Sequence, residues 1–199
     1  TLFLGGHDFG GPVALTFLRL FPKRAVKGLL LSATNLFTDT HVPLPLRLAG
    51  VPVLGTAFFH LFAGTRLGLR LLYWTATANK ATFRRSDFDR HLTPSGIKHT
   101  RRIFQRSLAD LKENYREVEA LLPHLDIPTL VLWGDCDPFL SVEVAKRLDR
   151  ILPHSMLTII EETGHFVPEE RPEMVAWNVH DFLKARWKRV SMTKTNSSP

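Results

Sequence analysis

Three short stretches of the chain carry residue types that could together form a covalent catalytic site. GHDFGG, near the start, holds Asp8 between glycines, WGDCDPFL holds Asp135 and Asp137, and ETGHFVPEERPE holds His165. A nucleophile, a histidine that acts as a base and an acid that orients the histidine are the groups that such chemistry requires. These residue types are therefore candidates for one site of covalent catalysis, with Asp8, His165 and one of the later acids as its members.

The GHDFGG stretch predicts a very tight turn from a strand into a helix. Such a turn requires small residues two positions before and two positions after its apex, because larger side chains would collide across it. Gly6 and Gly10 meet this requirement around Asp8. We expect Asp8 to have a strained backbone and to project its side chain above the sheet. The alternative role for Asp8 is that of a cap on the helix that follows.

The elements that would position these residues alternate between strands and helices. Four apolar runs have the composition of buried parallel strands, and each is followed by a turn and a helical pattern. These runs are TLFLGG, VKGLLLSAT, IPTLVLWGD and SMLTIIEETG. The alternation predicts an α/β fold with a mostly parallel sheet and helices on both faces. Asp8, the two acids Asp135 and Asp137, and His165 all follow strand ends, so we expect these groups to meet at one edge of the sheet.

Between residues 35 and 123 the strand pattern disappears and helical patterns replace it. The last of these predicted helices, over residues 101–122, places six large side chains on one face at alternating steps of four and three. They are Phe104, Leu108, Leu111, Tyr115, Val118 and Leu122. The sequence therefore predicts a core formed by residues 1–34 and 124–199, and an all-helical cap, residues 35–123, inserted between two strands.

The predicted core has fewer strands than a complete sheet of this kind. Four runs supply strands, and no residue precedes Thr1 to supply others on the far side of TLFLGG. No internal repeat or low-complexity segment offers another explanation. We therefore expect the sequence to be the C-terminal part of a longer chain whose N-terminal strands are missing.

Composition favours an ordinary globular protein. Of the 199 residues, 44% are hydrophobic and 23% are charged. The net charge of +7 arises in part from the C-terminal run KARWKRVSMTKTNSSP, and no basic stripe with interleaved aromatic residues accompanies it. We therefore expect no nucleic-acid partner. Cys136 is the only cysteine, which excludes an intrachain disulfide and is typical of a reducing compartment, so we expect a cytoplasmic location.

One uncharged stretch, residues 48–65, reaches the lower length limit for a membrane span. It contains Pro52, His60 and three glycines, and it is flanked by Arg47 and Arg66. These features favour buried helices of the predicted cap over a membrane-associated hairpin. We therefore expect no membrane partner.

The stretches GHDFGG, LVLWGDCDPF and GHFVPEERPE resemble the α/β-hydrolase superfamily, and within it the branch with an aspartate nucleophile, which includes epoxide hydrolases and haloalkane dehalogenases. The likeness extends over nearly the whole chain, up to Trp187. It implies that Asp8 is the nucleophile, Asp137 the orienting acid and His165 the base, with no metal or organic cofactor. Asp137 is preferred over Asp135 because the family's strand-end pattern W-G-x-x-D matches WGDCD.

An aspartate nucleophile changes the reaction that such a site performs. A carboxylate is ionised at neutral pH and can displace a leaving group from saturated carbon, which would form an alkyl ester on Asp8. His165, oriented by Asp137, would then take a proton from the water that attacks this ester. The resulting oxyanion requires N–H donors, and the backbone N–H of Phe9 is one candidate. The family's second donor follows an earlier strand in an H-G-x-P motif, which we expect upstream of Thr1. Without that donor, this chain alone would be a poor catalyst.

Two leaving groups fit this mechanism, and the resemblance distinguishes them by the residues that assist departure. Halide sites commonly use two tryptophans, one directly after the nucleophile, where this chain has Phe9. Epoxide sites commonly use cap tyrosines, for which Tyr73, with Trp74 beside it, and Tyr115 are the candidates. The alternative role for Tyr115 is packing on its apolar helix face.

We favour an epoxide hydrolase-like enzyme whose apolar pocket admits a small uncharged organic substrate and water. The alternatives are a haloalkane dehalogenase-like hydrolase and a non-catalytic hydrolase-fold protein that binds a ligand.

Overall fold

The computed structural model of the protein describes residues 2–40, 65–81 and 111–195, together with the single residues 57, 61, 93 and 96. Side chains are described within these ranges except at residues 111–114 and 186–195.

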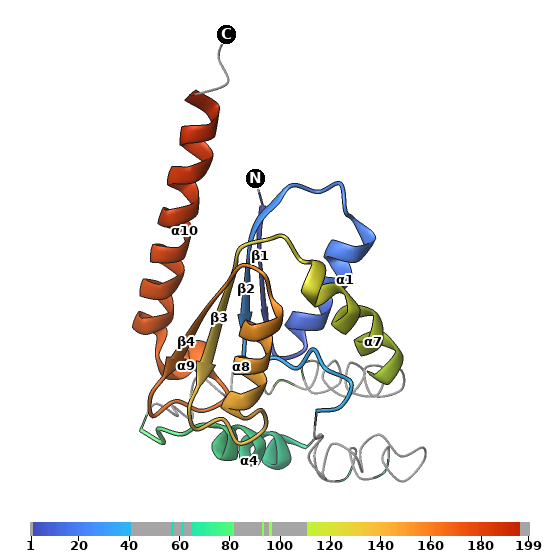
Figure 1. Ribbon diagram of the computed structural model, residues 1–199. Helices are drawn as coiled ribbons and strands as arrows, with labels where there is room; N and C mark the ends of the chain where they lie inside the picture. Colours follow the sequence, from blue (N-terminus) through green and yellow to red (C-terminus); the bar gives the residue numbers. More distant parts are fainter. Residues whose placement is uncertain are drawn as a thin grey trace.

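The centre of the molecule is a parallel sheet of four strands in the order β1-β2-β3-β4 (Figure 1). The strands are β1 (Leu2–His7), β2 (Val26–Ser32), β3 (Thr129–Gly134) and β4 (Ser155–Ile160). All four strands predicted from the sequence are therefore present, and their carboxyl ends lie at the same edge of the sheet. Parallel pairing requires a long connection between successive strands, and the intervening helices supply it.

Helices cover both faces of this sheet, as the sequence predicts (Figure 1). On one face lie α1 (Gly10–Leu20), α7 (Leu111–Leu121) and α8 (Val142–Ile151), and on the other lies α10 (Pro172–Thr195). Three short elements complete the described structure: α4 (Arg66–Ala76), the 3-10 turn η2 (Leu122–His124) and α9 (Val167–Glu170).

Strand β3 shows why the strand sequences read as uninterrupted apolar runs. All six of its residues are buried. Val131 and Trp133 pack into the core beneath α1, α7 and α8, whereas Leu130 and Leu132 pack with Phe182 of α10. Alternate residues of a strand face opposite sides of the sheet, so a sheet covered on both sides needs apolar residues at every position. Each fully buried leucine contributes about 1.5–3 kcal/mol.

The predicted cap is described only in part. Within residues 35–40, 65–81 and 111–123, α4, α7 and η2 form the regular structure, and no strand occurs among these residues. Of the predicted helix face, Tyr115, Val118 and Leu122 are buried. Phe104 and Leu108 lie outside the described residues. The division into a core and a cap remains a prediction.

An arginine joins the two ends of the segment between β2 and β3. The Arg147 guanidinium on α8 binds Asp39, which follows β2, at 2.6 Å and Glu119, on α7, at 3.1 Å. It also lies over the ring of Phe37, 3.9 Å from the ring centre. Glu119 in turn accepts hydrogen bonds from the backbone N–H and the hydroxyl of Thr38. Arg147 therefore holds together the segment that follows β2 and helix α7, which precedes β3.

None of the helices in the described parts of the chain is long and apolar enough to cross a membrane. The uncharged stretch 48–65 lies outside the described residues except at positions 57, 61 and 65.

Candidate active site

Asp8 occupies the sharp turn between β1 and α1. Its φ angle is +49°, in the left-handed region that non-glycine residues rarely adopt. Its backbone is held by hydrogen bonds on both sides: Asp8 N–H donates to the carbonyl of Ser32 (3.2 Å), and the Thr34 hydroxyl donates to the carbonyl of Asp8 (2.6 Å). These contacts stabilise the strained conformation predicted for the apex of the turn. The cap alternative receives no support, because helix α1 has Phe9 at its N-cap position and no side-chain cap.

The small residues required by the turn are not the pair predicted from the sequence. A Cβ atom on Gly6 would lie 2.3 Å from the carbonyl oxygen of Gly10, so Gly6 is required as expected. A Cβ atom on Gly10 would meet nothing within 4 Å, and that part of the prediction is wrong. Gly11 is the second tight position, because its Cβ would lie 2.1 Å from the Thr34 hydroxyl oxygen. The close contact of Gly6 thus runs across the turn, whereas that of Gly11 runs to Thr34, in the segment after β2.

The structure brings Asp8, Asp137 and His165 together at the carboxyl ends of three strands. His165 Nδ1 lies 2.8 Å from Asp137 Oδ2, and His165 Nε2 lies 3.9 Å from Asp8 Oδ1. The side chains of His165 and Asp137 are buried, whereas that of Asp8 is 43% exposed. The imidazole is therefore bonded to one carboxylate and adjacent to the other, which faces the open side of the site.

The hydrogen bond to Asp137 decides which imidazole nitrogen can act as a base. A carboxylate accepts, so Nδ1 carries the proton of neutral His165 and Nε2 presents its lone pair toward Asp8. Burial opposes the charged form of the imidazole. The hydrogen bond and charge of Asp137, with smaller contributions from Asp8 and Glu169, outweigh burial and raise the pKa of His165 above its ordinary value.

Asp137 is itself held by the chain that follows β3. Its Oδ1 accepts hydrogen bonds from the backbone N–H groups of Phe139 (2.8 Å) and Leu140 (3.0 Å). The carbonyl of Leu140 accepts a hydrogen bond from the indole N–H of Trp133 (2.8 Å). One carboxylate oxygen is thus used to fix the orientation of the group, and the other faces His165.

Asp135, the other acid of WGDCDPFL, has a different role. Its Oδ1 accepts a hydrogen bond from the backbone N–H of Thr163 (3.2 Å). Burial opposes this charge, but hydrogen bonds from Cys136 and Thr163 lower the pKa of Asp135. The hydrogen bond to Asp135 also raises the pKa of the Cys136 thiol, so this cysteine is not a reactive thiolate.

His7 and Glu170 hold the loop that carries His165. The sequence places His7 next to Asp8, where we expect a structural role, whereas sequence reasoning missed Glu170. His7 Nε2 donates a hydrogen bond to the carbonyl of His165 (2.9 Å). Glu170, only 4% exposed, accepts a hydrogen bond from the backbone N–H of Gly164 (3.0 Å). The N–H of His165 donates to the carbonyl of Ala76, at the end of α4 (2.8 Å). No spacing rule connects positions so far apart in the chain, and Glu170 stands beside a second glutamate in VPEE, so nothing in the sequence distinguishes it.

Both candidate tyrosines lie within electrostatic reach of Asp8. Burial, with the charges of Glu169 and Asp8, raises the pKa of Tyr73. Burial and the charge of Asp8 raise the pKa of Tyr115 to about 12. The Tyr73 ring stacks on Phe166, next to His165, with ring centres 4.1 Å apart. Both phenols therefore remain protonated at neutral pH and can donate a hydrogen bond.

Trp74 has different surroundings from Tyr73. Successive helix residues point about 100° apart, and Trp74 is 45% exposed with the Lys80 ammonium 4.9 Å from its ring centre. A role of Trp74 in the pocket remains a prediction. The same holds for Phe9, whose backbone follows Asp8 into α1.

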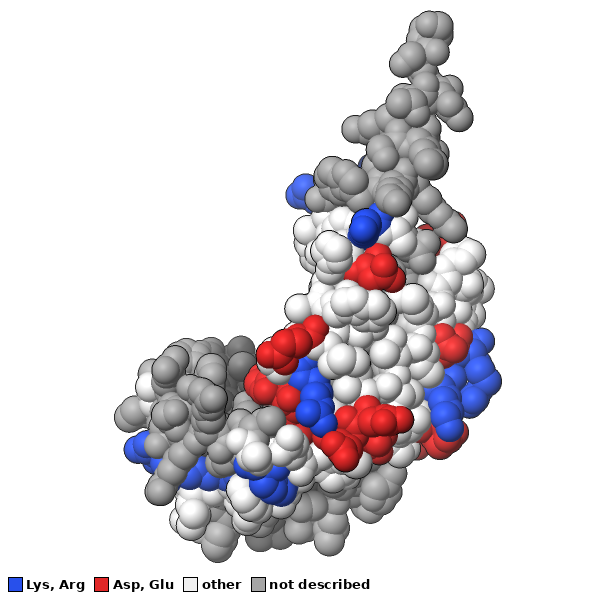
Figure 2. All heavy atoms as spheres, turned by 90° about the vertical axis from the view of Figure 1, so that its left-hand side faces the viewer, with Lys and Arg blue, Asp and Glu red and all other residues white. Residues whose placement is uncertain are grey.

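The surface near the histidine loop is acidic. Glu161, Glu162, Glu169 and Glu173 are all exposed, and Figure 2, which views the molecule from the α10 side, shows acidic side chains gathered low on this face with basic ones among them. Arg171 pairs with Glu162 at 3.3 Å. Among the described residues, no group of three or more His, Cys, Asp or Glu side chains is placed to hold a metal ion.

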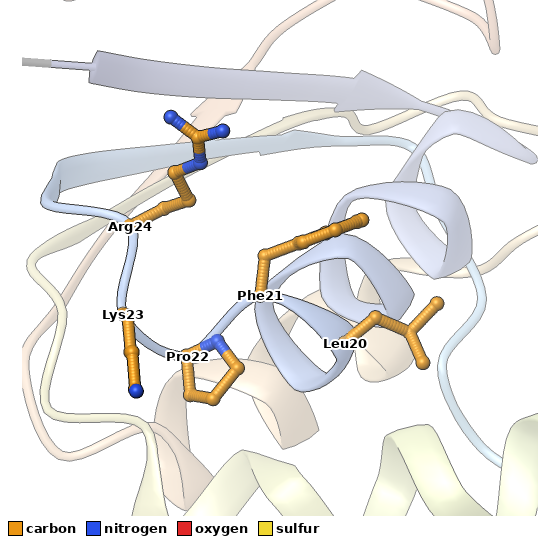
Figure 3. Close-up of a pocket in the computed structure, with 5 residues that line it drawn as sticks. All are labelled: Leu20, Phe21, Pro22, Lys23 and Arg24. Carbon is orange, nitrogen blue, oxygen red and sulfur yellow. The ribbon is translucent and has the colours of Figure 1, made fainter.

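A cavity of about 500 Å³ lies at the opposite edge of the sheet (Figure 3). It is lined by Leu20, Phe21, Pro22, Lys23 and Arg24, in the connection that leads from α1 to the amino end of β2. The three residues of the candidate site lie at the carboxyl ends of the strands, so this cavity is not part of the site.

Comparison with known proteins agrees with this fold. The hydrolase YugF of Bacillus subtilis, itself uncharacterised, is 28% identical to this chain over 185 residues, which cover 91% of the chain and 64% of YugF. Epoxide hydrolase 4 of Mus musculus is 25% identical over 201 residues, covering 92% of the chain and 54% of that protein. The structure of a thermophilic esterase from Thermogutta terrifontis is similar, with 28% identity, a TM-score of 0.60, and 94% of this chain and 65% of the esterase covered.

The chain thus spans between about half and two thirds of the length of these relatives. The family model for the alpha/beta hydrolase fold matches residues 1–172, which include all four strands and Asp8, Asp137 and His165. The chain belongs to the α/β-hydrolase family.

Proposed function

We propose that this chain carries the catalytic residues of a hydrolase that uses Asp8 as its nucleophile and opens epoxides. The observation that carries the proposal is the placement of His165, bonded to Asp137 through Nδ1 and facing Asp8 through Nε2 at 3.9 Å. Relatives of this chain include proteins named as esterases, lipases and epoxide hydrolases. The aspartate at the apex of the turn favours the last of these, because a carboxylate displaces leaving groups from saturated carbon.

The reaction proceeds in two steps. In the first, a carboxylate oxygen of Asp8 attacks a ring carbon of the epoxide, the carbon–oxygen bond breaks, and the ring oxygen takes up a proton. We assign Tyr73 and Tyr115 as the groups that donate hydrogen bonds to that oxygen, since both keep their protons at neutral pH and the charge of Asp8 acts on both. The product of this step is a hydroxyalkyl ester of Asp8.

In the second step, His165 Nε2 takes a proton from water, and the hydroxide attacks the carbonyl carbon of the ester. The tetrahedral intermediate collapses, and the alcohol oxygen leaves with the proton held by His165. The Asp8 carboxylic acid then loses its proton to solvent, which regenerates the carboxylate and returns the proton that the ring oxygen took up from solvent in the first step. Asp137 stabilises the imidazolium that forms between these events. The balance is one epoxide and one water consumed for each diol formed.

The first prediction tests the covalent step. Replacing His165 by Gln removes the base of the second step but leaves the nucleophile, so the variant should accumulate an ester on Asp8 when incubated with an epoxide such as styrene oxide. Intact-protein mass spectrometry should show a mass increase equal to the whole epoxide, and peptide mapping should place it on Asp8.

The matched control is Asp8→Asn in the same background, which should show no adduct. An adduct formed only from a haloalkane, with release of halide, would assign the alternative reaction. Absence of any adduct with both substrates would refute the aspartate nucleophile.

A further inference from the structure

The carboxylate of Glu170 connects two parts of the chain that are far apart in sequence. Its Oε1 accepts a hydrogen bond from the backbone N–H of Gly164 at 3.0 Å. Its Oε2 accepts two more, from Ala78 at 2.8 Å and from Asn79 at 3.1 Å. Gly164 directly precedes His165, whereas Ala78 and Asn79 directly follow α4, the helix that carries Tyr73.

This contact is buried and closely packed. Glu170 is 4% exposed. A Cβ atom on Gly164 would lie 2.2 Å from the carbonyl oxygen of Ala76, so the histidine loop and the end of α4 touch through their backbones. A buried carboxylate is costly unless its oxygens are hydrogen-bonded. Glu170 meets this condition with backbone donors alone. Among the described residues, no hydrogen bond joins Glu170 to the side chain of Asp8 or of His165.

The loop carrying the base is anchored on several sides. Thr163 N–H donates to Asp135, and Cys136 N–H donates to the Thr163 carbonyl. The carbonyl of His165 accepts from His7. These contacts all lead to the ends of β1 and β3. The connection to α4 consists of Glu170, the bond from His165 N–H to the Ala76 carbonyl, and the stacking of Tyr73 on Phe166.

We propose that Glu170 is a positioning residue that couples α4 to the histidine loop, so that the base and the leaving-group donor of the same site are set by one carboxylate. This inference rests on the proposed function. Glu170 acts through the backbone of Gly164 on one side and of Ala78 and Asn79 on the other, and it takes no part in bond making.

The substitution Glu170→Gln separates the two connections. An amide has one acceptor oxygen, and two donors converge on Oε2, so the amide oxygen should take the Oε2 position facing Ala78 and Asn79. The amide NH₂ then faces Gly164 N–H, and a buried donor is left without an acceptor. Loss of one buried hydrogen bond of this kind corresponds to a factor of about ten or more in an equilibrium. The variant should therefore lose the hydrogen bond to Gly164, in the histidine loop, and keep those to Ala78 and Asn79, which follow α4.

The experiment measures the two chemical steps separately in the Glu170→Gln variant of the intact protein, using styrene oxide. Ester formation should stay within about threefold of the unmodified protein, whereas ester hydrolysis should slow about tenfold or more. The Asp8 ester should therefore accumulate during turnover and be visible by mass spectrometry. A merely structural role would lower the amount of folded protein and reduce both steps equally, without any accumulation.

Two further variants serve as comparisons. Glu173→Gln makes the same charge change at an exposed position in the first turn of α10 and should leave both steps unchanged. Glu170→Asp keeps the charge but is too short to reach both sets of donors, so it should also slow ester hydrolysis. Full activity of the Asp variant, or equal slowing of both steps in the Gln variant, would overturn the proposal.

Amide hydrogen exchange provides a readout that needs no activity. Exchange of the Gly164 amide should become about tenfold faster in Glu170→Gln, with no change across β3. If the unmodified protein and its His165→Gln variant both fail to react with epoxide, the proposed function falls and this measurement alone decides the role of Glu170. Unchanged exchange at Gly164 would then refute it.

Discussion

At the scale of single residues, the site depends on one imidazole between two carboxylates. Asp137 holds Nδ1 of His165 at 2.8 Å, and Asp8 lies 3.9 Å from Nε2. The two acids differ in exposure, because the Asp137 side chain is fully buried and the Asp8 side chain is 43% exposed. The same residue type thus has two environments, one as the buried partner of His165 and one, under the proposed function, as the group that meets substrate.

The pH dependence of ester hydrolysis follows from the surroundings of His165. The neutral imidazole is the active base, so the rate should rise with pH as His165 loses its proton. Burial lowers the pKa of His165, but the hydrogen bond and charge of Asp137, the largest opposing contributions, raise it. Asp8 is uncharged in the ester, so its smaller contribution is lost there, and the midpoint should still lie above the ordinary value of 6.5 because Asp137 is kept. Single-turnover decay of the Asp8 ester at a series of pH values would measure it.

The variant Asp137→Asn provides the contrast for that profile. It removes the charge that raises the pKa and leaves the burial that lowers it, so any residual hydrolysis should show its midpoint at lower pH. A midpoint below 6.5 in the unmodified protein would contradict this account of the base.

At the scale of the elements, the turn between β1 and α1 is held by its neighbours. Asp8 keeps its left-handed backbone because Ser32 and Thr34, at the end of β2 and just beyond it, bond to its backbone on both sides. Gly11 allows Thr34 to approach that closely. The end of β2 and the residues just after it therefore stabilise the strained backbone of Asp8.

A pair of glycine variants tests which positions the turn requires. Gly6→Ala would place Cβ 2.3 Å from the Gly10 carbonyl oxygen, and the resulting overpacking should lower the free energy of unfolding by about 1–3 kcal/mol. Gly10→Ala meets no atom within 4 Å and lies at the start of α1, so it should be neutral or stabilising by up to about 1 kcal/mol. Urea denaturation of both variants measures the difference, and equal destabilisation would contradict the assignment.

At the scale of the whole molecule, Arg147 connects α8 to the two ends of the segment inserted between β2 and β3. Its guanidinium contacts Glu119, Asp39 and the ring of Phe37. Both ends of the insertion are thereby attached to the same helix. The insertion is anchored a second time at the end of α4, where Glu170 and His165 bind its backbone.

Removing the contacts of Arg147 should lower the stability of the fold without changing the residues of the candidate site. Arg147→Ala should lower the free energy of unfolding by about 1 kcal/mol, mainly through loss of the ring contact and of the partly exposed pair with Glu119. Thermal unfolding measured by circular dichroism gives the change, and Lys146→Ala, on the neighbouring exposed pair with Glu143, is the control with little expected effect. Equal effects of the two substitutions would show that Arg147 has no special role.

The fold and the three central residues could be predicted from sequence because their signals are local. Runs such as LVLW are apolar at every position, and Asp8, Asp137 and His165 each lie in the turn or loop that follows such a run. The role of Glu170 could not be predicted, since its partners are backbone N–H groups of residues as many as 92 positions away. The requirement for glycine at position 11 rather than 10 could not be predicted for the same reason. The close neighbour of Gly11 is Thr34, which lies in the segment after β2.

The bonds between α4 and the histidine loop have a consequence for divergence among related proteins. From α4 and the residues after it, they use only main-chain atoms: the carbonyl of Ala76 and the N–H groups of Ala78 and Asn79. Side chains along this stretch can therefore change without releasing the base. Under the proposed function, substitutions beside Tyr73 would alter which molecules fit there while the bonds that hold His165 are inherited intact.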